Sequence, residues 1–200
     1  MAPMPSPDGA SPRLSGQARK ILLALAKESI ENGLTAGRAL QVDADRYSPE
    51  LQERGACFVT LNRKGSLRGC IGHLEAIQPL LHDVAENAWS AAFCDPRFPP
   101  LEASEMADLT IQISVLSPPS PLLFSSEQEL IGKIRPGLDG LILEEGGHRG
   151  TFLPSVWQSL PDPANFLRHL KHKAGLPPDH WSDKIRVCRY ETESFSNTDP

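Results

Sequence analysis

A chain of 200 residues is long enough for one ordinary domain or for two small lobes that share a core. Its residues are 40% hydrophobic and 22% charged, which is typical of a folded protein, and its net charge of -5 argues against nucleic acid as a partner. No apolar run approaches the ~20 residues that a membrane-spanning helix needs, so a membrane protein is not expected.

The N-terminal segment and the cysteines indicate where the protein works. Residues 1–13 are rich in Pro, Ser and Gly and lack the apolar region of a secretory signal. They are expected to form a disordered tail before a folded domain at 14–196. The four cysteines are widely spaced, with no CxxC pair, and such thiols are expected to stay reduced. We therefore expect a cytoplasmic protein.

The first half of the chain predicts one helix and one hairpin. Apolar residues recur at three- and four-residue steps over Gln17–Asn32, which predicts a helix with Ser15 as its N-cap and Gly33 as its end. The alternating runs Ala56–Asn62 and Ser66–His73 flank a short turn and predict a β-hairpin.

Alternation along the second hairpin strand decides which side chains share a face. Leu67, Gly69 and Ile71 are expected on one face of the strand. Arg68 and Cys70 are expected on the opposite face, so the guanidinium and the thiol should point the same way.

A second helix and a third strand follow. Pro79–Cys94 carries an apolar stripe and predicts a helix, which the three prolines of Asp95–Leu101 cannot continue. Leu109–Leu116 alternates over its full length, which predicts a half-buried strand of an antiparallel sheet. The SPPSP run at Ser117–Pro121 is expected to end that strand and to mark a boundary between lobes.

The second half of the chain predicts further short helices and strands. They are helices at Ser126–Ile134, Ser155–Leu160 and Asn165–Ala174, a hairpin that turns at Gly146-Gly147, and a last strand at Asp183–Glu191. The predicted helices and hairpins follow one another without the regular strand–helix–strand alternation of βαβ units. We therefore predict an α+β fold with an antiparallel sheet and packed helices.

Cys70 is the main chemical candidate. Thiols react as thiolates, and Arg68 on the same strand face is expected to favour that form. His73 falls on the other face of an ideal strand, although Gly72 can bend the chain and bring it round. The alternative is a small, buried and inert cysteine.

Two other segments carry polar side chains of interest. Asp95 and Arg97 lie on a rigid Pro-rich loop that suits the wall of a binding site, or they form a local ion pair while Phe98 fills the core. His169 and His172 share a helix face, but two histidines do not complete a zinc shell. No metal or other cofactor is expected.

Several short motifs resemble one known family. LRGCIGHLEA, DPRFPPL, ISVLSPP, GLDGLIL, RGTFLP and KAGL occur in this order and look like those of the AmmeMemoRadiSam system protein A family, which carries the AMMECR domain. The resemblance covers most of the chain. It implies an α+β fold of two subdomains that flank a cleft, and a biochemical activity that is not settled.

The resemblance also implies site residues and partners. The motif positions carried over to this chain are Arg68, Gly69, Cys70, Gly72, Glu75, Asp95, Arg97 and Pro99. Family members are named for association with a Memo-like protein and a radical-SAM protein.

Two functional hypotheses follow from the residues and the resemblance. In the first, the protein is a cleft-based enzyme or enzyme component that acts on a small molecule or a modified side chain. Cys70 would then react, Arg68 and Arg97 would bind an anion, and Glu75, Asp95 or His73 would transfer protons. In the second, it is a binding or adaptor module that docks the Memo-like and radical-SAM partners.

Overall fold

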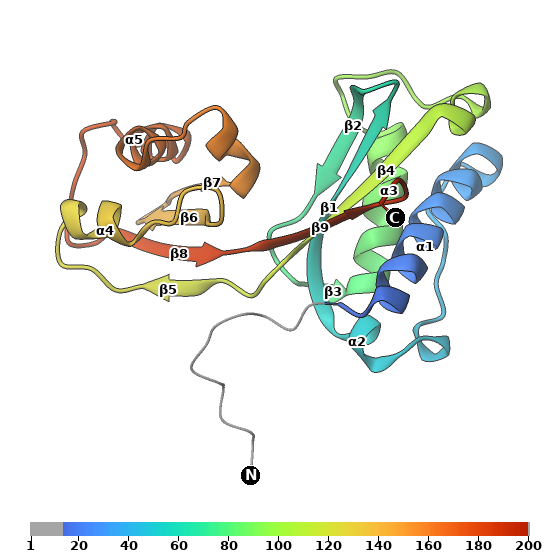
Figure 1. The fold of residues 1–200 in the computed structure, drawn as a ribbon, viewed down its shortest axis with the longest axis horizontal. Coiled ribbons are helices and arrows are strands. Elements are labelled where there is room, and N and C mark those ends of the chain that lie inside the picture. The colour runs from blue at the N-terminus through green and yellow to red at the C-terminus, as the bar shows by residue number, and fades with distance from the viewer. Residues whose placement is uncertain (1–13, 200) are drawn as a thin grey trace, which may run out of the picture. The chain divides into compact units, whose positions relative to one another are not determined.

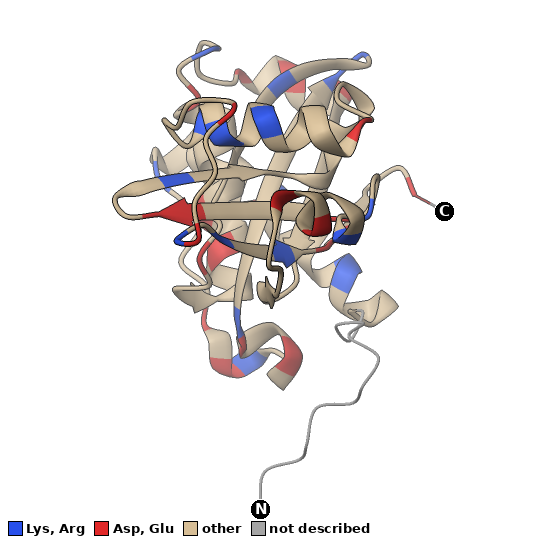
Figure 2. Ribbon diagram, turned by 90° about the vertical axis from the view of Figure 1, so that its left-hand side faces the viewer, with Lys and Arg blue, Asp and Glu red and all other residues tan. Residues whose placement is uncertain are grey.

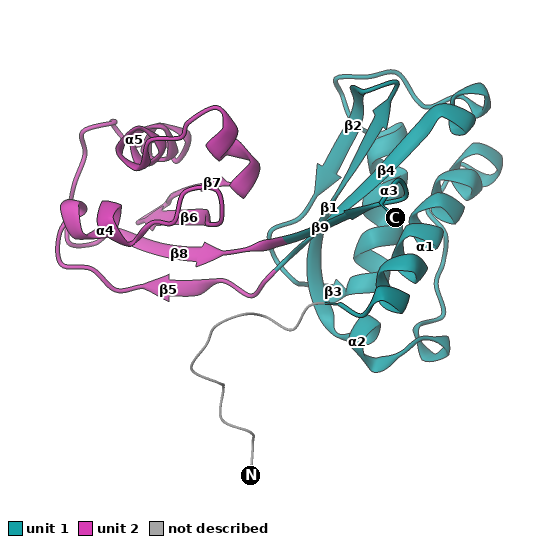
Figure 3. Cartoon of the chain, in the orientation of Figure 1, with its two compact units in different colours: residues 1–116, 193–200 teal, residues 117–192 magenta. Residues whose placement is uncertain are grey.

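The computed structural model describes residues 14–199, which fall into two compact units (Figures 1 and 3). Unit 1 comprises residues 14–116 and 193–199, and unit 2 comprises Ser117–Thr192. The tail expected at residues 1–13 lies outside the described residues.

Unit 1 is built on a five-stranded sheet. Its strands are β1 (Arg54–Arg63), β2 (Ser66–Gly72), β3 (Gln78–Pro79), β4 (Leu109–Leu116) and β9 (Thr192–Ser196). Their order is β2-β1-β4-β9, with β3 paired to the start of β1. Since β2 is the outer strand, one of its edges has no neighbouring strand along this order.

Two long helices cover one face of this sheet (Figure 1). They are α1 (Gly16–Ala36) and α3 (Leu80–Phe93); α2 (Pro49–Gln52) and two 3-10 turns at Ala44–Arg46 and Ala103–Asp108 complete the unit. The covered face carries Cys57, Val59 and Leu61 of β1, each fully buried. The alternation of β1 and β4 is confirmed, because polar residues such as Thr60 lie on the half-exposed face.

The predicted end of the first helix was wrong. Ser15 caps its start as expected, but the helix continues through Gly33 and ends before Gly37, which adopts the left-handed conformation. A side chain at Gly33 would collide with Trp89 and Phe93 of α3. The glycine therefore serves the close packing of two helices rather than the end of one.

The β1–β2 hairpin contains a bulge that the sequence did not predict. Leu61 pairs with Gly69 and Asn62 pairs with Leu67, so Arg68 is an extra residue in β2. The bulge breaks the alternation, and Leu67 is 43% exposed instead of sharing the buried face with Gly69.

Unit 2 is a four-stranded sheet with helices of its own. Its strands are β5 (Ser120–Leu122), β8 (Arg186–Tyr190), β6 (Gly140–Glu145) and β7 (His148–Phe152), in this order across the sheet. Its helices are α4 (Glu127–Lys133), a 3-10 turn at Pro154–Gln158 and α5 (Pro163–Lys173). In the core, the rings of Trp157 and Phe166 stack with centroids 3.8 Å apart.

The SPPSP run ends β4 as predicted, but part of it forms a strand. Ser120–Leu122 pairs with β8 at the edge of the sheet, a position at which proline is tolerated in strands.

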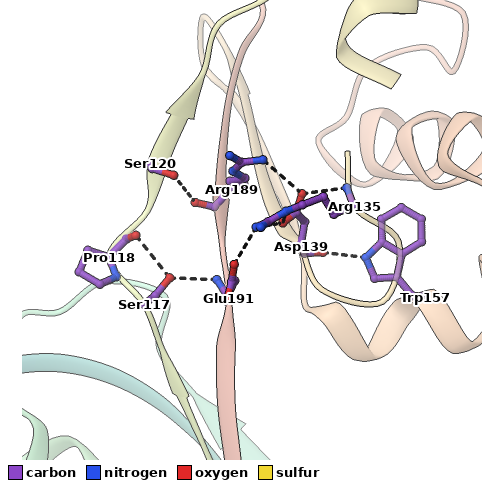
Figure 4. Close-up of polar contacts among 8 residues, drawn as sticks. All are labelled: Ser117, Pro118, Ser120, Arg135, Asp139, Trp157, Arg189 and Glu191. Atoms are coloured by element: carbon purple, nitrogen blue, oxygen red, sulfur yellow. Dashed lines mark hydrogen bonds and ion pairs between the residues drawn. The ribbon is translucent and has the colours of Figure 1, made fainter. Parts of the chain in front are cut away.

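A buried aspartate organises the loop before β6 (Figure 4). Asp139 is fully buried and accepts hydrogen bonds from the backbone and side chain of Arg135, while Arg189 lies 3.9 Å away. The Asp139 carbonyl accepts the indole N–H of Trp157 at 2.7 Å. The Arg135 guanidinium also binds Glu191 at 2.7 Å. These contacts fix the loop over the aromatic core of unit 2.

The predicted fold class is confirmed as mixed α+β, with two antiparallel sheets and packed helices. The cleft implied by the family resemblance stays a prediction. Among residues 14–199, no helix has the length and apolar character needed to cross a membrane. Acidic and basic residues are interspersed along the described ribbon (Figure 2).

Candidate functional site

The site is centred on Cys70, in the outer strand of unit 1. Cys70 lies opposite Thr60 of β1, and the Thr60 hydroxyl donates a hydrogen bond to the Cys70 sulfur at 3.3 Å. The Cys70 N–H donates to Asp95 at 2.9 Å, and its carbonyl accepts from Arg97 at 3.3 Å. This is the pattern of a non-hydrogen-bonded strand pair, in which side chains come close and backbone groups point outward. The half-buried thiol is thereby held in place from both sides.

Asp95 is the buried anchor of this arrangement, with 4% of its surface exposed. One carboxylate oxygen accepts the Cys70 N–H, and Arg97 binds both oxygens through its side chain, at 2.9 and 2.7 Å. The Arg97 hydrogen bonds and the two backbone N–H donors hold the pKa of Asp95 well below its ordinary value, although burial acts in the opposite direction. In this arrangement the Asp95 carboxylate accepts hydrogen bonds from Cys70 and Arg97.

Arg97 is the cation that contacts Cys70. Its side chain is 54% exposed, and its pKa is raised mainly by the hydrogen bond to Asp95, with a small contribution from Cys70 itself. Its direct contact with Cys70 is the hydrogen bond from Nη2 to the Cys70 carbonyl.

Arg68, which was expected to favour the Cys70 thiolate, is engaged elsewhere. Its guanidinium binds both oxygens of Glu105 at 2.9 Å, and Arg63 binds the same carboxylate at 3.0 Å. Hydrogen bonds from Arg68 and from the Glu102 backbone lower the pKa of Glu105 to about 2. Both guanidinium groups are paired with a carboxylate, but Arg97 also donates to the Cys70 carbonyl, so Arg97 is the better candidate for the cation beside Cys70.

One aromatic ring connects the two arginines. The guanidinium carbons of Arg68 and Arg97 lie 5.9 and 5.5 Å from the centre of the Phe98 ring. Both distances are in the range of a cation–π contact. The structure therefore brings Arg68, Cys70, Asp95 and Arg97 into one connected group, with Phe98 between the cations.

Packing accounts for the two glycines beside Cys70. A side chain at Gly69 would collide with the Ala91 carbonyl of α3, and one at Gly72 would collide with the Cys57 carbonyl and the Phe58 ring. Close approach of backbone explains both positions without a ligand.

His73 and Glu75 lie beyond the end of β2. The His73 ring binds Asp83 of α3 through Nδ1 at 3.0 Å, on the face of the sheet opposite to Cys70. Gly72 therefore does not bring His73 round to the thiol. Glu75 lies in the following loop, where its carbonyl accepts the Ile77 N–H at 3.0 Å.

A metal site does not emerge from the geometry. Within residues 14–199, no three His, Cys, Asp or Glu side chains gather in a way that could hold a metal ion. Most histidines have other partners; the His148 ring, for example, contacts the Ala174 carbonyl.

Comparison with known proteins identifies the family. A model of the AMMECR1 family matches residues 23–195. The chain belongs to the AMMECR1 family. It is 42% identical over 188 residues to a protein of Methanothermobacter thermautotrophicus, which covers 91% of this chain and 95% of that protein. It is 39% identical over 183 residues to a protein of Methanocaldococcus jannaschii, which covers 88% of each chain.

The fold comparison agrees with this assignment. The structure is similar to the crystal structure of an uncharacterized protein from Pyrococcus horikoshii, with a TM-score of 0.78 and 38% identity over 90% of this chain and 91% of that one. This AMMECR1-family chain thus has relatives across most of its length, and this relative of known structure is described as uncharacterized.

The sequence did not predict several residues of this candidate site. Thr60 and Phe98 contact the predicted residues directly, and Glu105 and Asp83 fix the orientation of Arg68 and His73. A signal was available for Thr60, since hairpin register places it opposite Cys70. No local pattern linked Glu105 to Arg68, which is 37 residues away in sequence.

Proposed function

We propose that the protein is an enzyme, or a component of an enzyme, that binds a small anionic molecule beside Arg97 and presents it to the thiol of Cys70. Arg97 contributes the positive charge, Phe98 contributes an apolar wall, and Cys70 contributes the nucleophile. Asp95 is a positioning residue, because it acts through Cys70 and Arg97.

The observation that carries this proposal is the double anchoring of Cys70. A buried carboxylate fixes its N–H, the paired arginine fixes its carbonyl, and a threonine hydroxyl reaches its sulfur. Cys57 has similar contacts, from Asp83 and Asn87, but it is fully buried, and burial, with a further contribution from the Asp83 charge, raises the pKa of its thiol. Cys70 differs because it is only half-buried and its carbonyl is bound by an arginine.

An anion is favoured because both guanidinium groups retain unused donor capacity. Arg68 uses Nε and Nη2 for Glu105, and Arg97 uses the same two atoms for Asp95. Nη1 of Arg68 is buried without a hydrogen-bond partner within the described residues. A carboxylate or phosphate is the ligand that such guanidinium donors bind best.

The experiment compares two alkylating reagents of similar size, the anion iodoacetate and the neutral iodoacetamide. In both reactions the sulfur forms a bond to the methylene carbon as iodide leaves. We expect the ratio of the iodoacetate rate to the iodoacetamide rate to be about threefold higher at Cys70 than at exposed Cys94, because Arg97 attracts the anion.

Two variants control for the source of this preference. Arg97→Ala should bring the rate ratio at Cys70 down to or below that at Cys94. Arg135→Ala removes a similarly exposed arginine from unit 2 and should leave the ratio unchanged. Equal ratios at the two cysteines of the wild-type chain would show that no anion preference exists.

A second function is favoured by a different observation. Leu67 and Ile77 are 43% and 60% exposed, and they lie before and after the Cys70 segment. Exposed apolar side chains of this kind suit a docking surface for partner proteins, here the Memo-like and radical-SAM partners that the family name implies. In a pull-down with such partners, Leu67→Asp should lose the partner while Cys70→Ser keeps it.

A further inference from the structure

A fully buried carboxylate holds an exposed histidine at the end of β2. Asp83, in the first turn of α3, accepts hydrogen bonds from the Cys57 N–H at 2.9 Å and from the Asn87 amide at 2.9 Å. It also contacts the Gln78 amide at 3.3 Å and His73 Nδ1 at 3.0 Å. Four partners occupy the four acceptor positions that a carboxylate offers.

The donor set decides where the proton of the His73 ring resides. The Cys57 N–H and the two amide nitrogens can only donate, so Asp83 acts as the acceptor toward them. The same carboxylate then accepts from His73, which places the ring proton on Nδ1. In neutral imidazole, the other nitrogen is left as a base. Nε2 belongs to a side chain that is 45% exposed, so solutes can reach it.

This pair is separate from the Cys70 site. Cys57 and Asn87, which accompany Asp83, lie on the helix-covered face of the sheet, whereas Cys70 contacts Thr60 on the opposite face. His73 therefore has no part in the thiol chemistry proposed above.

The charges around the pair are negative. Asp83 contributes to the raised pKa of the neighbouring Cys57 thiol, after burial, which shows the sign of the local field. Gln78, which contacts Asp83, also donates to the carboxylate of exposed Glu86 at 2.8 Å. Such surroundings repel an anion and admit a neutral or cationic molecule.

We propose that His73 and Asp83 form a second site that transfers protons, with a neutral or cationic small molecule carrying a hydroxyl or amino group as its ligand. His73 Nε2 takes the proton as the O–H or N–H bond of the ligand breaks, and the bonding electrons stay on the oxygen or nitrogen. Asp83 is a positioning residue that fixes the ring tautomer and stabilises the imidazolium that forms.

The first test reads the tautomer directly in the wild-type chain. Long-range ¹H–¹⁵N NMR correlations at neutral pH should show the His73 ring protonated on Nδ1, with Nε2 bearing no proton. A ring protonated on Nε2 alone, or on both nitrogens, would overturn the proposal. This measurement needs no substitution at buried Asp83, where a variant could fail to fold.

The second test measures the reactivity of Nε2 with 4-nitrophenyl acetate. Nε2 attacks the carbonyl carbon, 4-nitrophenolate leaves, and water hydrolyses the acetylimidazole to acetate. Because thiols attack the same ester, the measurement uses a chain in which Cys70 and Cys94 are replaced by Ser. His73→Gln should lower the rate of 4-nitrophenol release by about fivefold, less than the roughly 100-fold or more that a positioned group contributes in a complete active site, because the site does not bind this ester.

A matched control comes from unit 2. His180 also pairs with a carboxylate, that of Glu145 at 2.6 Å, but through Nε2. His180→Gln should leave the rate of 4-nitrophenol release close to that of the parent chain. A rate that is unchanged by His73→Gln would refute a reactive His73, whatever the outcome at Cys70.

Discussion

Two buried aspartates in this molecule are each bound by a partly exposed arginine from the same loop. Asp95 pairs with Arg97 in unit 1, and Asp139 pairs with Arg135 in unit 2. The aspartate side chains are 2% and 0% exposed, and the arginine side chains 54% and 42%. The two ion pairs are therefore nearly alike in burial and in charge.

They differ in what the aspartate does with its remaining acceptor positions. Each aspartate accepts the backbone N–H of its own arginine, but the Asp139 carbonyl also accepts from Trp157, so the Asp139 contacts close a loop over a core. Asp95 reaches out of its own loop to the N–H of Cys70, in a strand 25 residues earlier. The same kind of ion pair therefore closes a loop in one place and holds the backbone of Cys70 in the other.

The largest effect is expected from removing the buried aspartate of unit 2. Asp139→Ala leaves Arg135 without its partner and should lower the free energy of unfolding by about 3 kcal/mol, since breaking a buried pair typically costs this much. Thermal unfolding followed by circular dichroism measures the loss. If the Asp139 pair only closes its loop, the alkylation rate of Cys70 in the folded variant should stay at the wild-type value. A changed rate would mean that the Asp139 pair does more than close its loop.

A smaller effect on stability, with a different local effect, is expected for Asp95→Asn. The variant keeps the shape but loses the charge, which should cost about 2 kcal/mol, the usual contribution of hydrogen bonds to a charged group. Asparagine offers one acceptor oxygen where the carboxylate offers two, so the Cys70 N–H must compete with the Arg97 donors for it. Hydrogen exchange at the Cys70 amide should accelerate more than at the buried neighbour Leu61. Uniform acceleration along β1 and β2 would point to general destabilisation instead.

Acid should weaken unit 1 through Glu105. Its pKa is about 2 in the folded protein and about 4.5 when unfolded, so its stabilisation is present above pH 4.5 and is lost as the pH falls toward 2. Between pH 5 and pH 3 the loss should be about 1 kcal/mol after screening. Denaturant titrations at several pH values should show a shallower acid dependence for Glu105→Gln.

Glu129 provides the control for this pH effect. Its pKa is also lowered to about 2, mainly by Lys133, but the pair lies on the surface of α4. Glu129→Gln should change the acid dependence less than Glu105→Gln does, because solvent screens exposed pairs. An equal change would show that burial of Glu105 is not the cause.

The smallest effect is expected from Arg68→Ala on the chemistry of Cys70. Since Glu105 already neutralises this guanidinium, the rate of Cys70 alkylation by iodoacetamide should change by less than about twofold. Arg97→Ala should have the larger effect, because Arg97 contacts the residue itself. If Arg68→Ala slowed the alkylation of Cys70 more than Arg97→Ala does, Arg68 would be the cation that favours the thiolate.

Local sequence patterns predicted most of the fold, where burial on one side imposes alternation. Leu109–Leu116 was predicted with its observed bounds, because its buried residues lie at every second position over most of its length. The rule failed where a tertiary contact overrides local preference. Gly33 looks like a helix end but lies inside α1, since Trp89 and Phe93 leave no room for a side chain.

The candidate site was only partly predictable for a related reason. Cys70, Asp95 and Arg97 stand in short motifs whose residue types already suggest chemistry. Arg68 appeared to be the cation beside Cys70 because ideal alternation puts both on one face, and a bulge with an unforeseen partner, Glu105, breaks that inference. Tertiary contacts decide which acidic side chain pairs with which arginine, and the spacing of residues along the sequence does not reveal those contacts.

The most direct test of the account is the alkylation of the four cysteines of the native wild-type protein by iodoacetamide, resolved by mass spectrometry. Buried Cys57 gives the alkylation rate of an inaccessible thiol, and exposed Cys94 gives the rate of an ordinary surface thiol. We expect half-buried Cys70 to react faster than Cys94, although it is less accessible, and faster than half-buried Cys188. A Cys70 that reacts more slowly than Cys94, or only when the protein unfolds together with Cys57, would contradict it.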